Sequence, residues 1–171
     1  MIADLFRSML ETPFGPVHIA VDADGVLVEV WLPRRAASSF ESRVTLPRSA
    51  AAGARAVQTQ LDEYFRGKRR DFDLPLDPDG SPFEQQVWAR LRTIPYGATT
   101  SYGAIADELG LTNGARAVGR ANGANPIPIV IPCHRVIGAD GQLTGYGGGL
   151  PLKRALLELE GAIAPPQPRL L

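Results

Sequence analysis

The sequence contains very little cysteine and histidine. Its 171 residues include one cysteine, Cys133, and two histidines, His18 and His134. One cysteine cannot form an intramolecular disulfide, and so few cysteine and histidine side chains cannot build the usual zinc site. We therefore expect no bound metal, no cofactor, and a reducing compartment such as the cytoplasm, where a free thiol persists.

The sequence also lacks an excess of either charge and any long hydrophobic run. Eighteen basic and eighteen acidic residues give a formal net charge of zero, which argues against a surface that is basic throughout. No segment approaches the roughly 18 apolar residues of a membrane-spanning helix, and no secretory leader pattern is present. Residues 85–157 nevertheless contain seven basic and three acidic side chains. We expect a cytoplasmic globular protein, without membrane contact, that has a local basic surface.

The first half of the chain begins with the pattern of a β-hairpin. Apolar residues alternate over residues 17–21 and 26–32, with Asp24 and Gly25 between the two runs. An Asp-Gly pair readily adopts the backbone of a tight turn. The two runs are therefore predicted to be antiparallel neighbours.

A helix and a short strand are predicted after this hairpin. Residues 50–66 carry apolar side chains at helical spacing, and Ser49 is placed to cap that helix. Residues 72–76 alternate as in a strand, whereas residues 77–81 contain proline and glycine and favour neither element. We therefore predict an N-terminal α/β domain at residues 1–76 and a linker at 77–81.

The second half, residues 82–171, is predicted to be mostly helical. Ser81 and Glu84 have the spacing of a capping box, which marks the start of a helix. Two shorter helices are expected at residues 100–110 and 114–122, joined by a tight turn. Two short helices connected in this way predict a helix-turn-helix.

The second of these short helices is rich in glycine and alanine. Asn113 precedes it as the expected N-cap, and its long side chains are Arg116 and Arg120. Small residues let a backbone approach another surface closely. The composition therefore fits either tight packing against another helix or close approach to a nucleic-acid groove, and both interpretations stay open.

The single cysteine lies in an unusual segment. An apolar stretch that begins with two closely spaced prolines is predicted to be extended and leads directly to Cys133. A lone cysteine among apolar residues is commonly an inert core residue. Asn125, His134 and Arg135, however, are unusual neighbours for a buried structural thiol, which favours a reactive one.

A reactive thiol needs a base, because the thiolate is the nucleophile. In an extended segment Cys133 and His134 would point to opposite sides, so a water molecule would have to carry the proton between them. A carboxylate on the far side of the imidazole would stabilise its charged form. Glu158 and Glu160, at the end of a helix expected at residues 151–160, are the two candidates.

The residues around Cys133 resemble the active-site motif of the O6-alkylguanine-DNA alkyltransferases, the methylated-DNA–protein-cysteine methyltransferases. The similarity covers about residues 81–161, and its segments follow the order of the family: residues 101–103, 115–119, 125–128, 132–136, 145–146 and 156–161. This resemblance implies a ribonuclease-H-like N-terminal domain, with a small antiparallel sheet and a helix. A mostly α, winged-helix-like C-terminal domain that contains the helix-turn-helix would follow it.

The resemblance also implies the function and the catalytic residues. The protein would flip O6-alkylguanine, and O4-methylthymine as well, out of duplex DNA and transfer the alkyl group irreversibly to Cys133. His134 would act as the base through water, Glu160 would orient His134, and Asn125 would tie the recognition helix to the active-site loop. Each molecule would act once, because a thioether has no easy reverse reaction.

DNA contacts and a substrate pocket are implied in the same way. The DNA-binding residues would be Tyr102, Gly103, Ala115, Arg116 and Arg135. The substrate pocket would include Pro128, Val136 and Tyr146. Arg116 would fill the place of the extruded base, Tyr102 would rotate the neighbouring phosphate, and the helix-turn-helix would lie in the minor groove of double-stranded DNA. The protein is expected to act as a monomer that needs no protein partner, with cooperative binding on DNA left open.

Two alternatives compete with this interpretation. In the first, the chain is a winged-helix module that binds DNA lesions or regulates a gene, and Cys133 is structural. In the second, Cys133, His134 and Glu160 form the triad of a thiol hydrolase. Such a triad normally places the imidazole where it contacts the sulfur directly, which neighbouring residues do not readily allow.

Overall fold

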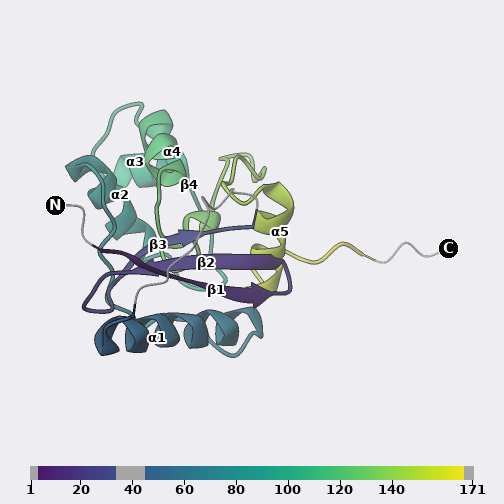
Figure 1. Cartoon of the computed structure of the whole chain (residues 1–171). Helices are drawn as coiled ribbons and strands as arrows, with labels where there is room; N and C mark the ends of the chain where they lie inside the picture. The colour runs from purple at the N-terminus through teal and green to yellow at the C-terminus, as the bar shows by residue number, and fades with distance from the viewer. Residues whose placement is uncertain (1–3, 34–44, 168–171) are drawn as a thin grey trace.

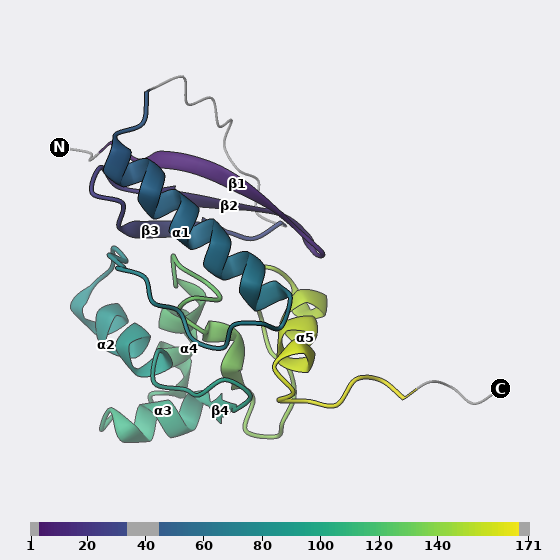
Figure 2. The ribbon, with the colours of Figure 1, turned by 90° about the horizontal axis from the view of Figure 1, so that it is seen from below.

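The computed structural model describes residues 4–33 and 45–167. The N-terminal half forms a three-stranded antiparallel sheet in the order β1-β2-β3, and α1 covers one face of it (Figure 1, Figure 2). The elements of this half are β1 (Phe6–Thr12), β2 (Gly15–Val21), β3 (Leu27–Trp31) and α1 (Arg48–Phe65). None of the helices in the described part of the chain is long and apolar enough to cross a membrane.

The predicted hairpin is confirmed, since β2 and β3 are antiparallel neighbours. The Asp22 carboxylate accepts hydrogen bonds from the backbone N–H groups of Asp24 and Val26, both at 2.9 Å. Gly25 has a φ of +85°, and a Cβ there would lie 2.5 Å from the carbonyl oxygen of Ser49. Glycine is therefore needed at this position both for the turn and for its close approach to α1.

The predicted cap of α1 is wrong. The helix begins at Arg48, its N-cap position is Pro47, and no side chain accepts a capping hydrogen bond. The hydroxyl of Ser49 donates instead to the carbonyl oxygen of Ala23, in the turn between β2 and β3. The Ser49 hydroxyl therefore bonds the docked hairpin turn and not the helix N-terminus that the local sequence predicts.

The predicted strand at residues 72–76 is reduced to one bridge, between Leu76 and Leu27. The N–H of Leu27 donates to the carbonyl of Pro75 at 3.0 Å, and its carbonyl accepts from the N–H of Asp77 at 2.9 Å. Pro75 has no N–H, so it cannot extend this pairing into a longer ladder. The apolar side chains of the segment still pack against the core.

Strand β1 is not predicted by the hydrophobic pattern. Its residues alternate between more buried and more exposed positions, but the more buried side includes Ser8 and Thr12. Met9, on the other side, is 47% exposed. The strand therefore forms mainly because it pairs with β2 along its whole length.

The C-terminal half is mostly helical. Its elements are α2 (Pro82–Leu91), β4 (Thr100–Ser101), α3 (Tyr102–Glu108), α4 (Ala115–Gly123), the 3-10 helix η1 (Cys133–Arg135), β5 (Val136–Ile137) and α5 (Leu150–Leu159). The capping box is confirmed, because the Ser81 hydroxyl accepts from the Glu84 N–H and the Glu84 carboxylate accepts from the Ser81 N–H. The two short strands β4 and β5 pair in parallel.

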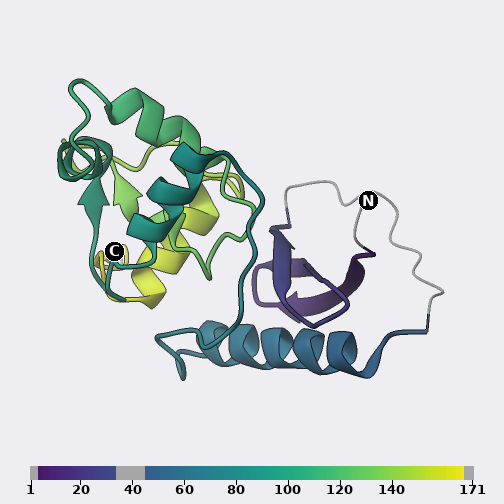
Figure 3. The same ribbon diagram turned by 90° about the vertical axis from the view of Figure 1, so that its left-hand side faces the viewer.

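Helices α3 and α4 pack against each other as the predicted helix-turn-helix (Figure 3). The Ser101 hydroxyl caps α3 by accepting from the Ala104 N–H, and Gly110 follows the helix with a φ of +71°. The prediction that Asn113 is the N-cap of α4 is wrong. Gly114 occupies that position, and no side chain caps the helix. Asn113 has a φ of +52°, so its backbone forms the turn instead.

The two halves meet along the edge of the sheet. Strand β3 is the edge nearest the C-terminal half (Figure 2, Figure 3). The N–H of Val30 donates across this boundary to the carbonyl of Pro126 at 2.9 Å. One cluster of buried apolar residues runs through both halves, so the loop that follows Pro126 is held between them.

Candidate active site

Cys133 lies at the start of η1 and is 5% exposed. It lines a cavity of about 40 Å³ between the edge of the sheet and the C-terminal half. The other lining residues are Val30 and Leu32 from the N-terminal half, Asn122, Gly123, Asn125 and Pro128 from α4 and the loop after it, and Gly145, Tyr146 and Gly147. The expected pocket residues Pro128 and Tyr146 are therefore at the cavity. Val136 does not line it and is fully buried in the core.

The segment before Cys133 is a closed loop and not the predicted extended strand. The N–H of Ile131 donates back to the carbonyl of Ile127 at 2.9 Å, and Ile129 has a φ of +75°. The buried side chain of Asn125 closes the loop, accepting from the Ile127 N–H at 3.0 Å and donating to the Ile131 carbonyl at 2.8 Å. Asn125 thus ties the end of α4 to the loop that carries Cys133.

His134 and Glu160 form a fully buried pair. The distance from His134 Nε2 to Glu160 Oε1 is 2.7 Å, and both side chains are 0% exposed. The other ring nitrogen, Nδ1, is buried and has no hydrogen-bond partner among the described residues. No hydrogen bond within the described chain joins Glu158 to His134. Of the two candidate carboxylates, the structure therefore places Glu160 at the imidazole.

Glu160 receives four further hydrogen bonds. Arg135 donates its Nε to Oε2 and its Nη2 to Oε1, both at 2.9 Å, and the Tyr64 hydroxyl donates to Oε1 at 2.7 Å. The Gly97 N–H lies 3.5 Å from Oε2. Burial alone would raise the pKa of Glu160, but the hydrogen bonds from His134 and Arg135 outweigh it and hold the pKa at about 2. Glu160 is therefore charged at every pH at which the protein would work.

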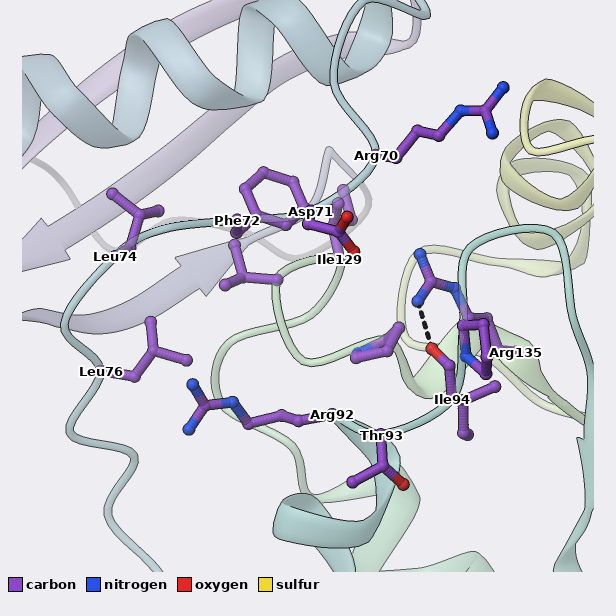
Figure 4. Close-up of a pocket in the computed structure, with 13 residues that line it drawn as sticks. Arg70, Asp71, Phe72, Leu74, Leu76, Arg92, Thr93, Ile94, Ile129 and Arg135 are labelled. Atoms are coloured by element: carbon purple, nitrogen blue, oxygen red, sulfur yellow. Dashed lines mark hydrogen bonds between the residues drawn. The ribbon is translucent and has the colours of Figure 1, made fainter.

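Arg135, expected among the DNA-binding residues, is buried in the structure and pairs with Glu160, away from the exposed surface of the helix-turn-helix. It is 6% exposed, and besides its two bonds to Glu160 it donates Nη1 to the carbonyl of Ile94 at 2.6 Å (Figure 4). It lines a cavity of about 230 Å³ together with the segment after α1 and the end of α2. All three guanidinium nitrogens donate inside the protein, so Arg135 holds Glu160 in place.

The thiol and the imidazole have complementary proton affinities. Burial raises the pKa of Cys133 to about 11, while the Asn125 side chain and Lys153 oppose this shift. Burial also lowers the pKa of His134 below its ordinary value, although Glu160 opposes this. At neutral pH the thiol is therefore protonated and the imidazole is neutral, so His134 is able to accept the proton that Cys133 must lose.

Lys153 is a site residue that the sequence interpretation missed. Its side chain is fully buried in α5, and Nζ donates to the carbonyls of Val136 at 2.6 Å and Thr144 at 2.9 Å. Burial lowers the pKa of Lys153 to about 8. The helical periodicity of the sequence could have predicted this burial, because Lys153 lies three residues before Leu156 on the buried face of α5. The ammonium group joins β5 to the loop at Thr144 and favours a thiolate at Cys133.

The other expected DNA-binding residues lie on the helix-turn-helix. Ala115 and Arg116 are exposed at the start of α4, and Gly103 is in the first turn of α3. The Tyr102 hydroxyl shares a 2.8 Å hydrogen bond with the Thr144 hydroxyl. A Cβ at Gly103 would have no neighbouring atom within 4 Å, so the surface beside this residue is open.

The structure shows that the small residues of α4 pack tightly against neighbouring helices. A Cβ at Gly119 would lie 3.7 Å from the ring of Tyr102, and the carbonyl of Ala121 accepts from Trp88 Nε1 at 2.8 Å. These residues let α4 pack against α3 and α2. Arg116 and Arg120 are exposed, on the side away from the buried residues Val118, Ala121 and Asn122.

Comparison with known proteins places the chain in a family. The family model described as "6-O-methylguanine DNA methyltransferase, ribonuclease-like domain" matches residues 5–78, and the one described as "6-O-methylguanine DNA methyltransferase, DNA binding domain" matches residues 82–162. A methylated-DNA–protein-cysteine methyltransferase of Mycobacterium bovis is 49% identical over 91% of this chain and 92% of its own. One of Methanosarcina acetivorans is 40% identical over 92% of this chain and 99% of its own.

Solved structures of the same family have a similar fold. The O6-methylguanine methyltransferase of Mycobacterium tuberculosis superposes with a TM-score of 0.78 at 43% identity, covering 96% of this chain and 97% of that one. A structure of the M. tuberculosis protein in complex with DNA gives a TM-score of 0.77 at 45% identity, covering 91% and 92% of the two chains. The expected fold, a small antiparallel sheet with a helix followed by a helical DNA-binding domain, is confirmed. With both halves matched and close relatives along nearly its whole length, the chain belongs to the 6-O-methylguanine DNA methyltransferase family.

Proposed function

We propose that this protein repairs DNA by taking the alkyl group of O6-alkylguanine, and of O4-methylthymine, onto the sulfur of its own Cys133. The observation that carries the proposal is the position of Cys133, which lines a cavity beside a neutral imidazole that is paired with a buried, charged carboxylate. The relatives named as methylated-DNA–protein-cysteine methyltransferases and the related structure with DNA support the same reaction.

The first step is proton transfer. His134 Nδ1 has no hydrogen-bond partner in the part of the chain that the structure describes, so a water molecule between it and Cys133 would carry the thiol proton to the ring. Glu160 would stabilise the resulting imidazolium through its 2.7 Å contact with Nε2. In a buried site this counter-charge matters more than it would in water.

The second step is alkyl transfer. The thiolate attacks the alkyl carbon, the new S–C bond forms as the C–O6 bond breaks, and the electron pair leaves with guanine, which takes up a proton. Tyr146 lies at the cavity, and its buried hydroxyl has no partner among the described residues. Burial raises the pKa of Tyr146 well above its ordinary value, so this hydroxyl stays protonated and would donate a hydrogen bond to the leaving base.

The target base must reach this cavity from the DNA. A cavity of about 40 Å³ has room for a few water molecules and not for a purine, so the loop with Gly145 and Gly147 must open when a flipped base enters. The helix-turn-helix would bind the minor groove, where the small residues of α4 allow close approach. Tyr102 would turn the neighbouring phosphate, and Arg116 would occupy the space that the base leaves.

The remaining expectations belong to this proposal. We place the domain boundaries at residues 1–76, 77–81 and 82–171, and we propose that a single copy of the chain carries out the reaction on double-stranded DNA. The cytoplasm is the fitting compartment, because a reducing environment keeps the Cys133 thiol free. No metal or cofactor is needed, since the chain itself supplies the nucleophile, the base and a hydrogen-bond donor for the leaving base.

Arg116 separates base flipping from chemistry. We expect Arg116→Ala to weaken binding to a lesion-containing duplex about 10-fold and to leave the reaction with free O6-alkylguanine base unchanged, because Arg116 lies on the surface and not at the cavity. Fluorescence anisotropy and a free-base transfer assay measure the two effects. Arg92→Ala, an exposed arginine at the end of α2, is the matched control and should change neither. Equal losses with duplex and free base would contradict the role of Arg116.

Stoichiometry distinguishes the proposed reaction from both alternatives. With excess duplex that carries a radiolabelled methyl group on guanine O6, we expect the label on the protein to reach one equivalent and stop. A binding module with a structural cysteine would take up no label. A thiol hydrolase would turn over ester or peptide substrates many times, and either result would overturn the proposal.

A further inference from the structure

The carboxylate that serves His134 is also bound by the N-terminal half. Tyr64, near the C-terminal end of α1, donates its hydroxyl to Glu160 Oε1 at 2.7 Å. The same oxygen contacts His134 Nε2 at 2.7 Å and Arg135 Nη2 at 2.9 Å. One carboxylate oxygen is therefore shared by three donors, and the one that comes from α1 is 96 residues away in sequence.

The Tyr64 ring is held so that its hydroxyl has a fixed direction. The ring is 0% exposed, and its centroid lies 5.5 Å from those of Phe65 and Phe72 and 6.3 Å from that of Tyr96. Burial and the neighbouring Glu160 charge raise the pKa of Tyr64 far above its ordinary value. The hydroxyl thus remains a donor throughout the working pH range.

We propose that Tyr64 is a positioning residue for alkyl transfer: its hydroxyl holds Glu160 in place and limits how strongly that carboxylate attracts the His134 proton. The inference rests on the proposed function. Because α1 belongs to the N-terminal half, docking of this half then sets the proton affinity of the base in the other half. The N-terminal domain thereby acts on the chemistry and does not serve as packing alone.

The direction of the effect follows from the sharing of Oε1. Without the Tyr64 hydroxyl, more negative charge stays on the oxygen that faces Nε2, and the imidazolium form of His134 is stabilised. The charged groups that act on His134 are Glu160, Arg135 and Lys153. Three tyrosines lie around the same Glu160 charge: Tyr64, which donates to it, and Tyr96 and Tyr146, which do not. Tyr64→Phe removes one hydrogen bond to Glu160 without altering net charge or emptying the ring site.

The direction in which the pH–rate profile moves follows from this change in the pKa of His134. His134 must be neutral to accept the Cys133 proton, so transfer slows as pH falls through the pKa of His134. Removing the Tyr64 hydroxyl raises that pKa, and the acid side of the pH–rate profile must move to higher pH. A purely structural role of Tyr64 would lower the amount of folded protein and leave the profile in place.

The experiment compares Tyr64→Phe with Tyr96→Phe in the full chain. Tyr96 packs against the same aromatic ring, but its hydroxyl donates to the Leu159 carbonyl at 3.2 Å and not to Glu160. Single-turnover rates on a saturating O6-methylguanine duplex are measured across pH. Because Glu160 loses a donor that holds it in place, we expect Tyr64→Phe to slow transfer about 2- to 10-fold at neutral pH. The variant should also move the acid limb to higher pH and leave duplex affinity unchanged. Tyr96→Phe should keep the wild-type profile.

Each other outcome counts against the inference. An unshifted acid limb in Tyr64→Phe, or the same shift in Tyr96→Phe, would overturn it. So would a fall in Tm of more than about 10 °C in Tyr64→Phe, which would mark the hydroxyl as a major structural group. NMR titration of His134 in a Cys133→Ala background measures the pKa change directly and must show a rise. If the wild-type protein itself transfers no methyl group, the proposed function fails, and that result is distinct from all of these.

Discussion

Replacing Cys133 with alanine is expected to abolish alkyl transfer and to leave affinity for a lesion-containing duplex unchanged. The substitution removes the sulfur that forms the new bond, while Arg116 and the rest of the exposed helix-turn-helix surface are untouched. Cys133 is small and 5% exposed, so the cavity left behind costs only about 1 kcal/mol of stability. Label transfer and electrophoretic mobility shift on the same duplex measure the two properties.

The control for this prediction is Cys133→Ser, which keeps nearly the same volume. A serine hydroxyl is far less acidic than a thiol, so His134 cannot generate the nucleophile and transfer should be lost equally. Methyl label on either variant would show that another side chain accepts the group. Loss of duplex binding in both variants would show that the thiol supports the DNA-binding surface, contrary to the separation seen in the fold.

Glu160→Gln is expected to have the second largest effect, on both rate and stability. The amide cannot stabilise an imidazolium as a carboxylate does, and transfer should fall about 100-fold. It also leaves the Arg135 guanidinium buried without its counter-charge, which typically costs about 3–5 kcal/mol. Single-turnover kinetics and urea unfolding at pH 7 measure the two losses.

The pH dependence of stability provides a second readout for Glu160. Its pKa is held at about 2 in the folded protein, below the usual value of about 4.3 for an unfolded chain. The stabilisation is therefore complete above the unfolded pKa and is lost as pH falls from there toward 2. The glutamine variant should lose less stability than wild type over this window.

Glu158→Gln is the matched control, two residues away on the same helix end. Glu158 is half-buried, and no hydrogen bond within the described chain joins it to His134. Its replacement should leave the transfer rate within about twofold of wild type. Equal slowing by the two glutamine variants would mean that general charge at this helix end matters, and not the specific pair with His134.

Local signals predicted the parts of the fold that local interactions determine. Asp24 and Gly25 predicted the hairpin because a tight turn needs little beyond its own residues. Ser81 and Glu84 predicted the start of α2 because the capping box satisfies backbone groups within one turn. The caps expected at Ser49 and Asn113 were wrong where tertiary contact or turn geometry took precedence.

The site required information that no local pattern contains. Because Cys133, His134 and Arg135 form a 3-10 turn and not an extended strand, all three side chains are buried, and Arg135 pairs with a carboxylate 25 residues later. Tyr64 reaches the same carboxylate from the other half of the chain. The cysteine and histidine were identifiable from their chemistry, whereas the partners that tune them were fixed only by how the two halves pack.

The most direct test of the account is the mass of the peptide that contains Cys133. The protein is incubated with excess O6-methylguanine duplex, digested and analysed by tandem mass spectrometry. The account predicts a gain of one methylene unit on Cys133, in an amount equal to the repaired guanine. An unmodified Cys133 after the duplex has been repaired, or a methyl group on any other residue, would contradict it.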